Sequence, residues 1–127
     1  PAHAAEPVDL LVATISADDR LVRAAIASGT RGIVVAATGA GNTDPALLEV
    51  ATDAMASGIP VVLATRALSG RAGARYGFVG GGAWWLKAGA IPAGALSGPK
   101  ARVTLALGLG AGLDDTGLRR LFSATGG

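Results

Sequence analysis

Three short apolar segments rich in Val, Ile, Leu and Ala recur in the first half of the chain, and segments of helical periodicity separate them. The apolar segments span residues 8–14, 32–37 and 60–65. Runs this short and this continuously apolar are typical of strands that are buried on both faces of a sheet. Strands that alternate with helices over short links predict a parallel sheet with right-handed crossover connections.

The segments between these strands carry the signals of amphipathic helices. Ser16 and Asp19 resemble a capping box, and Gly29 is placed to end the first helix. Pro45 suits the first turn of a second helix, which Gly58 closes. The residues expected to face the core are Leu21, Val22, Ala25 and Ile26 in the first helix, and Leu47, Leu48, Ala51, Ala54 and Met55 in the second.

The second half of the chain has a weaker pattern. Residues 67–83 hold six glycines without a clear period, which predicts a long loop, and Lys87–Ile91 is expected to form a short fourth strand. Ser97, followed by Pro99, is expected to cap another helix, and Asp114–Asp115 to begin the last one, before a flexible tail at residues 124–127. The inward residues expected in these two helices are Val103, Leu105, Ala106 and Leu109, then Leu118, Leu121 and Phe122.

Together these elements predict an α/β fold, a three-layer sandwich in which a small parallel sheet of about four strands is flanked by helices. Residues 1–7 are interpreted as a lead or linker, and residues 8–127 as one domain. A chain of 127 residues, 50% of them hydrophobic, is long enough for one core and too short for two full domains.

The composition excludes several classes of protein. The 11 Lys and Arg residues stand against 9 Asp and Glu without forming a basic stripe, so we expect no nucleic-acid partner. No uncharged apolar run approaches the roughly 20 residues of a membrane span, so no membrane partner is expected. The lack of Cys excludes thiolate catalysis and Cys-ligated zinc, and no spacing of His, Asp and Glu indicates a metal. Nothing in the composition identifies the compartment.

The most informative candidate site is the glycine-rich turn after the second expected strand. In open parallel sheets, ligands bind at the carboxyl ends of the strands. The glycines of Gly39–Asn42 let backbone N–H groups approach a ligand, and the Asn42 amide can both donate and accept hydrogen bonds. Gly41 and Asn42 are therefore candidate binding residues, although a tight turn in which Asn42 satisfies the backbone gives the same pattern.

Other residues near the expected strand ends leave alternatives open. Arg66 either binds an anion or ties down its own loop through carboxylates. A threonine nucleophile at a strand end needs an activating base, and the single His, His3, lies in the lead segment. The chain therefore shows no self-sufficient catalytic set. The Trp84–Trp85 pair is interpreted as an exposed-loop pair, a small satellite core or an interface anchor.

Several short motifs, taken in order and spacing, resemble one family. They are Arg31–Val35, Gly39–Asn42, Gly58–Val62, Thr65–Arg66, Ser69–Gly70, Gly89–Ala93 and Leu96–Arg102. Their series is similar to the smaller, C-terminal domain of bacterial-type L-asparaginases, and the similarity covers the chain from Val8 to Phe122.

The resemblance implies an amidohydrolase that converts L-asparagine, and in some members L-glutamine, to the acid plus ammonia, without metal or organic cofactor. It places the nucleophile threonines on a larger N-terminal domain that this chain lacks, so the chain alone is expected to be inactive. Members of the family are homo-oligomers in which the C-terminal domain of one subunit closes the active site of its neighbour. Asn42 matches the Asn that helps to hold the substrate amino group, and Arg66 is expected to support its loop.

Other functions stay open from the sequence. The same α/β domain can serve as a small-ligand binding or regulatory module, because a fold does not fix a function. An asparaginase-like subunit of a tRNA-dependent amidotransferase shares this domain, although the missing basic patch disfavours it. A role in assembly alone would depend on the Trp84–Trp85 pair and on the low charge.

Overall fold

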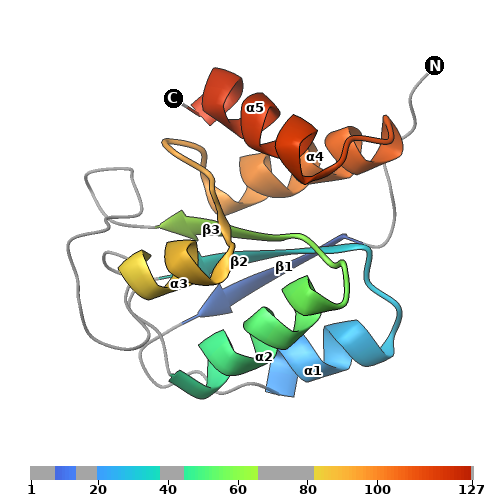
Figure 1. Ribbon diagram of the computed structural model, residues 1–127, viewed down its shortest axis with the longest axis vertical. Coiled ribbons are helices and arrows are strands. Elements are labelled where there is room, and N and C mark those ends of the chain that lie inside the picture. The colour runs from blue at the N-terminus through green and yellow to red at the C-terminus, as the bar shows by residue number, and fades with distance from the viewer. Residues whose placement is uncertain (1–7, 14–19, 38–44, 66–81, 127) are drawn as a thin grey trace.

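Four parallel strands form the centre of the computed structural model, which describes residues 8–13, 20–37, 45–65 and 82–126. The sheet order is β1–β2–β3–β4, so that strands adjacent in sequence are adjacent in space (Figure 1). The strands are β1 (Val8–Ala13), β2 (Gly32–Ala37), β3 (Val61–Thr65) and β4 (Ile91–Pro92). The predicted α/β class and the parallel sheet of about four strands are confirmed.

Helices cover both faces of this sheet. They are α1 (Arg20–Ala27), α2 (Pro45–Ala56), α3 (Gly82–Ala88), α4 (Gly98–Gly110) and α5 (Asp115–Gly126). The crossover helices α1 and α2 lie on one face, and α4 and α5 lie on the other (Figure 1). When two crossover connections have the same handedness and each leads to the next strand in the same direction, their helices lie on the same face of the sheet. The three-layer arrangement therefore follows the prediction.

The two central strands separate two apolar clusters. Ile33 and Val35 of β2 pack in the cluster shared with α1, α2 and Trp85 of α3. Val34 of β2 and Val62 of β3 pack in the cluster shared with α4 and α5. Because side chains alternate between the faces of a strand and both faces are covered here, β2 and β3 need an unbroken apolar sequence.

The helix ends largely follow the local signals. Gly29 and Gly58 have φ values of 87° and 89°, a left-handed conformation that glycine adopts without a steric penalty just after α1 and α2. The Ser97 hydroxyl accepts a hydrogen bond from the Lys100 N–H at 3.4 Å and caps α4, with Pro99 in its first turn. The expected capping box at Ser16 lies outside the described residues.

The expected strand over Lys87–Ile91 is wrong in its first part. Helix α3 continues to Ala88, Gly89 follows with a φ of 115°, and β4 begins only at Ile91. The side chain of Trp85 is fully buried in the core cluster and holds α3 against the sheet. The Trp84–Trp85 pair is therefore helical, and Trp85 belongs to the main core. Of the expected loop over residues 67–83, the structure describes only the end, where α3 already begins at Gly82.

The expected flexible tail is also wrong as far as Gly126. Helix α5 continues to Gly126, whose carbonyl accepts a hydrogen bond from the Ala95 N–H at 2.7 Å. A Cβ on Gly126 would collide with the Ala93 carbonyl, and one on Gly94 would collide with the Gly126 carbonyl. Two residues without side chains thus let the end of α5 dock against the turn that follows β4.

Two residues expected to face inward are exposed. Leu21 on α1 is 57% exposed, and Val103 on α4 is 53% exposed. Leu21 lies about 100° around the helix from Val22, which is buried, so it falls outside the inward face. The expected inward residues that are buried are Val22, Ala25, Leu47, Leu48, Ala51, Ala54, Leu105, Ala106, Leu118 and Phe122.

Candidate functional site

The carboxyl ends of β1, β2 and β3 lie side by side and form the carboxyl edge of the sheet (left in Figure 1). Ala37, the last residue of β2, is in register with Ala13 of β1 and with Thr65 of β3. Neighbouring strands lie about 4.8 Å apart. The chain therefore leaves the sheet at three adjacent positions, and β2 provides the middle one.

The candidate residues follow these strand ends in the sequence. Gly41 and Asn42 come between Ala37 and Pro45, the first residue of α2, and Arg66 directly follows Thr65. All three candidates lie outside the described residues, as do the residues from Thr14 to Asp19. Their assignment to a binding site stays a prediction, and the structure supplies the frame from which they extend.

This frame is firmly packed up to the strand ends. Val35 and Ala36 of β2, and Leu63 and Ala64 of β3, are buried immediately before the edge. A site that extends from buried strands is positioned more precisely than one held by loops alone. The carboxyl edge therefore offers a rigid base for a binding turn.

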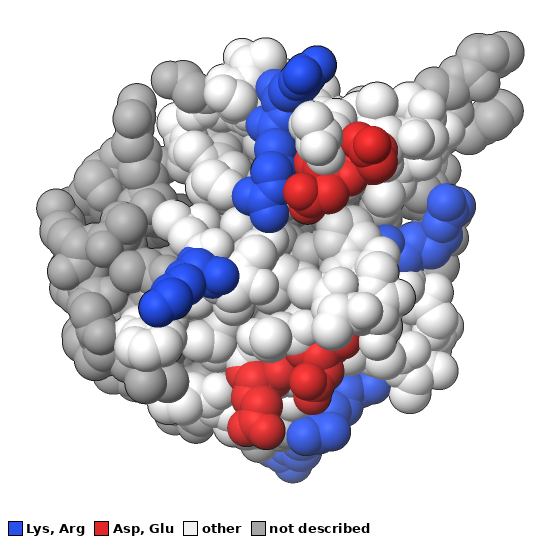
Figure 2. Space-filling model, viewed as in Figure 1, with Lys and Arg blue, Asp and Glu red and all other residues white. Residues whose placement is uncertain are grey.

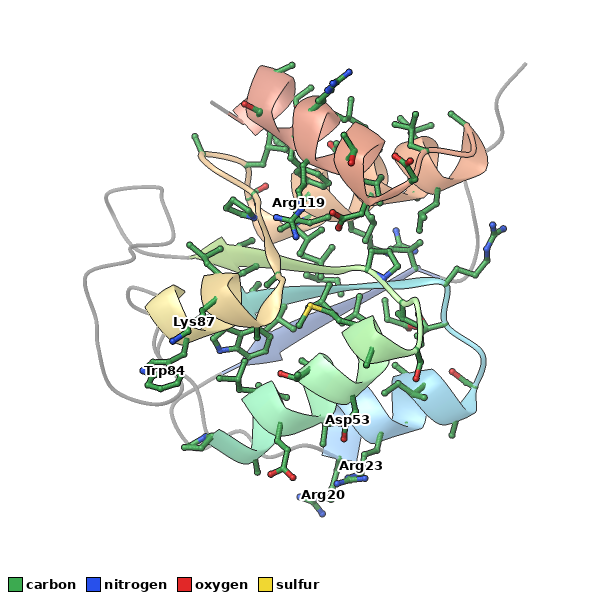
Figure 3. All side chains as sticks on the ribbon, in the orientation of Figure 1. Arg20, Arg23, Asp53, Trp84, Lys87 and Arg119 are labelled. Atoms are coloured by element: carbon green, nitrogen blue, oxygen red, sulfur yellow. The ribbon has the colours of Figure 1, made fainter. Side chains whose placement is uncertain are left out.

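Helix α3 presents an aromatic ring and a cation on its outer side. The Lys87 ammonium lies 5.6 Å from the centroid of the Trp84 ring, and both side chains project from the same side of the helix (Figure 3). An exposed contact of this kind contributes about 0.5–1 kcal/mol. Trp84 is thus a surface residue of α3, whereas its neighbour Trp85 anchors the helix.

The strand order contains no reversal within the described sheet. In doubly wound sheets, a ligand crevice forms where the strand order reverses and the connections diverge to opposite faces. Every step from β1 to β4 goes in the same direction, so the described strands form no such crevice. A ligand held at this carboxyl edge would need additional protein surface to enclose it.

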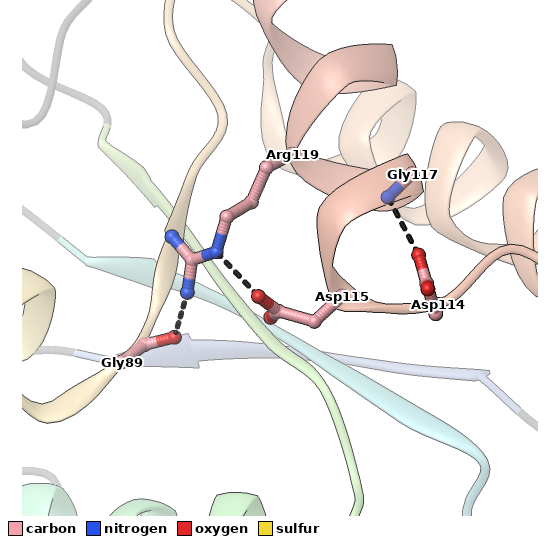
Figure 4. Close-up of polar contacts among 5 residues, drawn as sticks. All are labelled: Gly89, Asp114, Asp115, Gly117 and Arg119. Carbon is pink, nitrogen blue, oxygen red and sulfur yellow. Dashed lines mark hydrogen bonds and ion pairs between the residues drawn. The ribbon is translucent and has the colours of Figure 1, made fainter.

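A hollow lies near the amino ends of β3 and β4, and its lining includes Val61, Ile91, Asp114 and Asp115. Its acidic side chains form hydrogen bonds and an ion pair within the domain. Asp114 Oδ1 accepts a hydrogen bond from the Gly117 N–H at 2.9 Å (Figure 4). Asp115 pairs with Arg119 Nε at 2.8 Å, and Arg119 Nη2 donates to the Gly89 carbonyl at 2.7 Å. These contacts tie the start of α5 to the turn between α3 and β4. The two acidic side chains that line this hollow therefore already have partners within the domain.

Charged side chains of both signs share the outer surface of α1 and α2 (Figure 2). They include Arg20 and Arg23 on α1, and Glu49 and Asp53 on α2. Within the described ranges, no three His, Asp or Glu side chains come together in a way that could hold a metal ion. The same ranges contain no helix with the length and apolar character needed to cross a membrane.

Comparison with known sequences decides the family. The sequence profile of the Glutaminase/Asparaginase C-terminal domain matches residues 7–122. The chain belongs to this family. The probable L-asparaginase of Deinococcus radiodurans is 46% identical to this asparaginase C-terminal domain over 94 residues, which cover 72% of this chain and 28% of that protein. The L-asparaginase of Bacillus licheniformis is 29% identical over 100 residues, covering 79% of this chain and 31% of that protein.

The fold leads to the same family. The thermostable L-asparaginase from Thermococcus kodakarensis superposes with a TM-score of 0.77 at 31% identity, over 94% of this chain and 36% of that chain. The resemblance drawn from the motifs is thereby confirmed. This asparaginase C-terminal domain spans about a third of the length of the relatives that it matches.

One surface feature was missed in the sequence. Val103 and Leu107, one helical turn apart on α4, are 53% and 49% exposed. The signal that could have revealed it is the composition of residues 103–113, which include no charged residue. A helix that is apolar all round is normally covered on all sides.

Proposed function

We propose that this chain is the C-terminal domain of an L-asparaginase that hydrolyses L-asparagine to L-aspartate and ammonia, and that it completes the active site of a neighbouring subunit. Family membership and the names of the relatives support the reaction class. The one-third coverage of those relatives supports the existence of a larger N-terminal domain beyond this chain. The boundaries, with residues 1–7 as a lead and 8–127 as the domain, belong to the same proposal.

The observation that carries the proposed site is the register of Ala13, Ala37 and Thr65. Because β2 lies between β1 and β3, the segment with Gly41 and Asn42 follows the middle one of the three strand ends at the carboxyl edge. The described strands form no crevice of their own there, which fits a site closed by a second protein surface. In the proposal, Gly41 and Asn42 contact the substrate, and Arg66 supports the adjoining loop.

The chemistry divides between the two domains in this proposal. Amide hydrolysis needs an activated nucleophile and stabilisation of the developing oxyanion. The proposal assigns both to the N-terminal domain, whose threonines act as nucleophiles, and requires no cofactor. The Asn42 side-chain carbonyl can accept a hydrogen bond from the substrate ammonium, and correct orientation of a substrate accounts for a large part of enzymatic rate enhancement.

Ammonia release from L-asparagine tests the proposal. The purified 127-residue chain is expected to show no turnover, because the proposal places the nucleophile on the N-terminal domain. The complete gene product, which should include the larger domain, is expected to hydrolyse L-asparagine as a homo-oligomer. Turnover by the 127-residue chain would contradict the assignment of the nucleophile to the N-terminal domain. An inactive complete gene product would contradict the assignment as an asparaginase.

Calorimetry separates the proposal from a role as a binding or regulatory module. The chain is titrated with asparagine, aspartate and nucleotides in turn. Saturable binding of a nucleotide that is lost on an Asn42→Ala change would favour the regulatory function. The proposal predicts no such nucleotide binding, and it predicts strong asparagine binding only when the N-terminal domain is present.

A further inference from the structure

The two edges of the described sheet differ in length and in sequence. At one edge, β4 has two residues and ends with the exposed Pro92, which has no N–H group to donate. At the other edge, β1 has six residues and pairs with β2 alone. Short edge strands and edge prolines prevent pairing with another chain, whereas a longer edge strand offers a row of backbone groups to it. The edge of β1 therefore needs a different form of protection.

The sequence of β1 favours strand pairing at every position except one. Val8 and Asp9 are followed by four apolar residues, and the strand contains no Pro and no Gly. Segments of about six residues with high β-propensity, low charge and no Pro pair readily between chains. Asp9 carries the only charge in the four described strands, and it lies in the long edge strand.

The Asp9 side chain lies on the face of the sheet that α1 and α2 cover. In the parallel register Asp9 is opposite Ile33, which packs in the core cluster shared with these helices. Its neighbours Val8 and Leu10 pack on the other face. The Oδ2 atom of Asp9 is buried and has no hydrogen-bond partner among the described residues. A carboxylate in this position costs folding stability, so the stability of the fold does not account for it.

We propose that Asp9 prevents the edge of β1 from pairing with a second copy of this chain, and this proposal does not depend on the enzymatic function. Asp9 as a whole is only partly buried, so the residue still reaches solvent. An added strand would lie about 4.8 Å from β1 and would cover the residue. The carboxylate would then lose water without gaining a partner, and a charge buried in this way strongly opposes association.

A second copy is the partner to be excluded, because every copy presents the same edge. Two β1 strands can pair antiparallel across a two-fold axis, where identical surfaces meet and close a dimer. This pairing makes the two sheets continuous, so both Asp9 carboxylates would lie on the same face. Repulsion between the like charges then adds to the cost of their lost hydration.

Sedimentation velocity of the 127-residue chain over a range of concentrations tests this proposal. Asp9→Val removes the charge and supplies a residue that suits a strand. Asp53→Val is the matched control, because Asp53 is exposed on α2 and the same substitution there changes the net charge equally. Both substitutions raise the formal net charge above its value of +2, and a larger net charge by itself opposes association.

The self-association constant of Asp9→Val is expected to exceed that of the unaltered chain at least about tenfold, because burial of an unpaired carboxylate no longer opposes pairing. Asp53→Val is expected to sediment as the unaltered chain does. A folded Asp9→Val variant that associates no more strongly than the unaltered chain would overturn the proposal, and so would an equal increase in Asp53→Val. If circular dichroism shows that Asp9→Val does not fold, Asp9→Asn, which has nearly the same shape and no charge, takes its place with the same two criteria.

Amide hydrogen exchange measured by NMR locates the contact between copies. The alternate N–H groups of β1 that point away from β2 are expected to exchange rapidly in the unaltered chain. In Asp9→Val their exchange is expected to slow as the protein concentration rises, because a second strand then accepts their hydrogen bonds. Association of Asp9→Val without this protection would place the contact on another surface and overturn the proposal.

Discussion

Arg102 of α4 and Val8 of β1 are joined by a 2.8 Å hydrogen bond from the guanidinium Nε to the main-chain carbonyl, across 94 positions of sequence. Within the described sheet, β1 is an edge strand that pairs with β2 alone. An edge strand has a strand neighbour on one side only, and here a side chain of α4 donates to its first carbonyl. Helix α4 therefore secures the start of the sheet as well as covering its face.

Arg102→Met is expected to lower the free energy of unfolding by about 1 kcal/mol. Hydrogen bonds to charged groups contribute about 1.5–3 kcal/mol, and the exposure of Arg102 reduces that figure. Urea unfolding of the 127-residue chain measures the change. Arg120→Met on α5 serves as the control, since it removes the same charge from an exposed helix position. Equal losses in the two variants would show that the Val8 bond contributes nothing measurable.

Trp85→Ala is expected to reduce the free energy of unfolding by about 3–5 kcal/mol, because truncating a fully buried Trp leaves a large cavity. Trp84→Ala is the matched control. Trp84 is 37% exposed, and its Lys87 contact contributes about 0.5–1 kcal/mol, so the loss of stability should be clearly smaller. Denaturant unfolding compares the two variants, and the reverse order would contradict the placement of Trp85 in the core.

Gly126→Ala is expected to destabilise the chain by about 1–3 kcal/mol, the range found when atoms are forced into a close-packed site. The added methyl group would collide with the Ala93 carbonyl and disturb the hydrogen bond from Ala95 to Gly126. Ser123→Ala changes an exposed position of the same helix and should leave the thermal midpoint nearly unchanged. A Gly126→Ala midpoint equal to that of Ser123→Ala would mean that the end of α5 is not docked in solution.

Strands β1, β2 and β3 and the ends of α1 and α2 could be predicted from the sequence because their signals are local. The apolar runs of β2 and β3 and the glycines at 29 and 58 each specify their own conformation. Helix α3 and the end of α5 could not be predicted in this way. Their conformations depend on contacts made far along the chain, by Trp85 in the core and by Gly126 against the turn after β4.

The candidate site was predictable only as a position on the sheet. Parallel topology places the segments after β1, β2 and β3 at one edge, and the register of Ala13, Ala37 and Thr65 agrees with that expectation. The contacts of Asn42 could not be predicted from this chain alone, because in the proposed function they are made with substrate and with another domain. Val103 lies about 200° around α4 from the buried Leu105, so the helical period itself turns its side chain outward.

Asp9→Val is expected to raise the free energy of unfolding by about 1–3 kcal/mol. Among the described residues, the buried Oδ2 atom of Asp9 has no hydrogen-bond partner, and a buried polar atom left unpaired costs about that amount. Valine also suits a strand position opposite Ile33. Chemical unfolding at neutral pH measures the gain, and Asp9→Asn, which retains a polar group, should gain less. A destabilised Asp9→Val variant would show that the carboxylate has a favourable role.

Asn42→Ala in the complete gene product is expected to lower kcat/KM for L-asparagine by about 10- to 150-fold. That range corresponds to the roughly 1.5–3 kcal/mol of a hydrogen bond to a charged group, here the substrate ammonium. The unfolding midpoint of the variant should match that of the unaltered protein, because the effect requires bound substrate. If Asn42 also orients the substrate for attack, kcat falls together with the affinity, whereas a pure binding contact raises KM alone. Steady-state ammonia release over a range of asparagine concentrations distinguishes these two cases, and unchanged kinetics would remove Asn42 from the site.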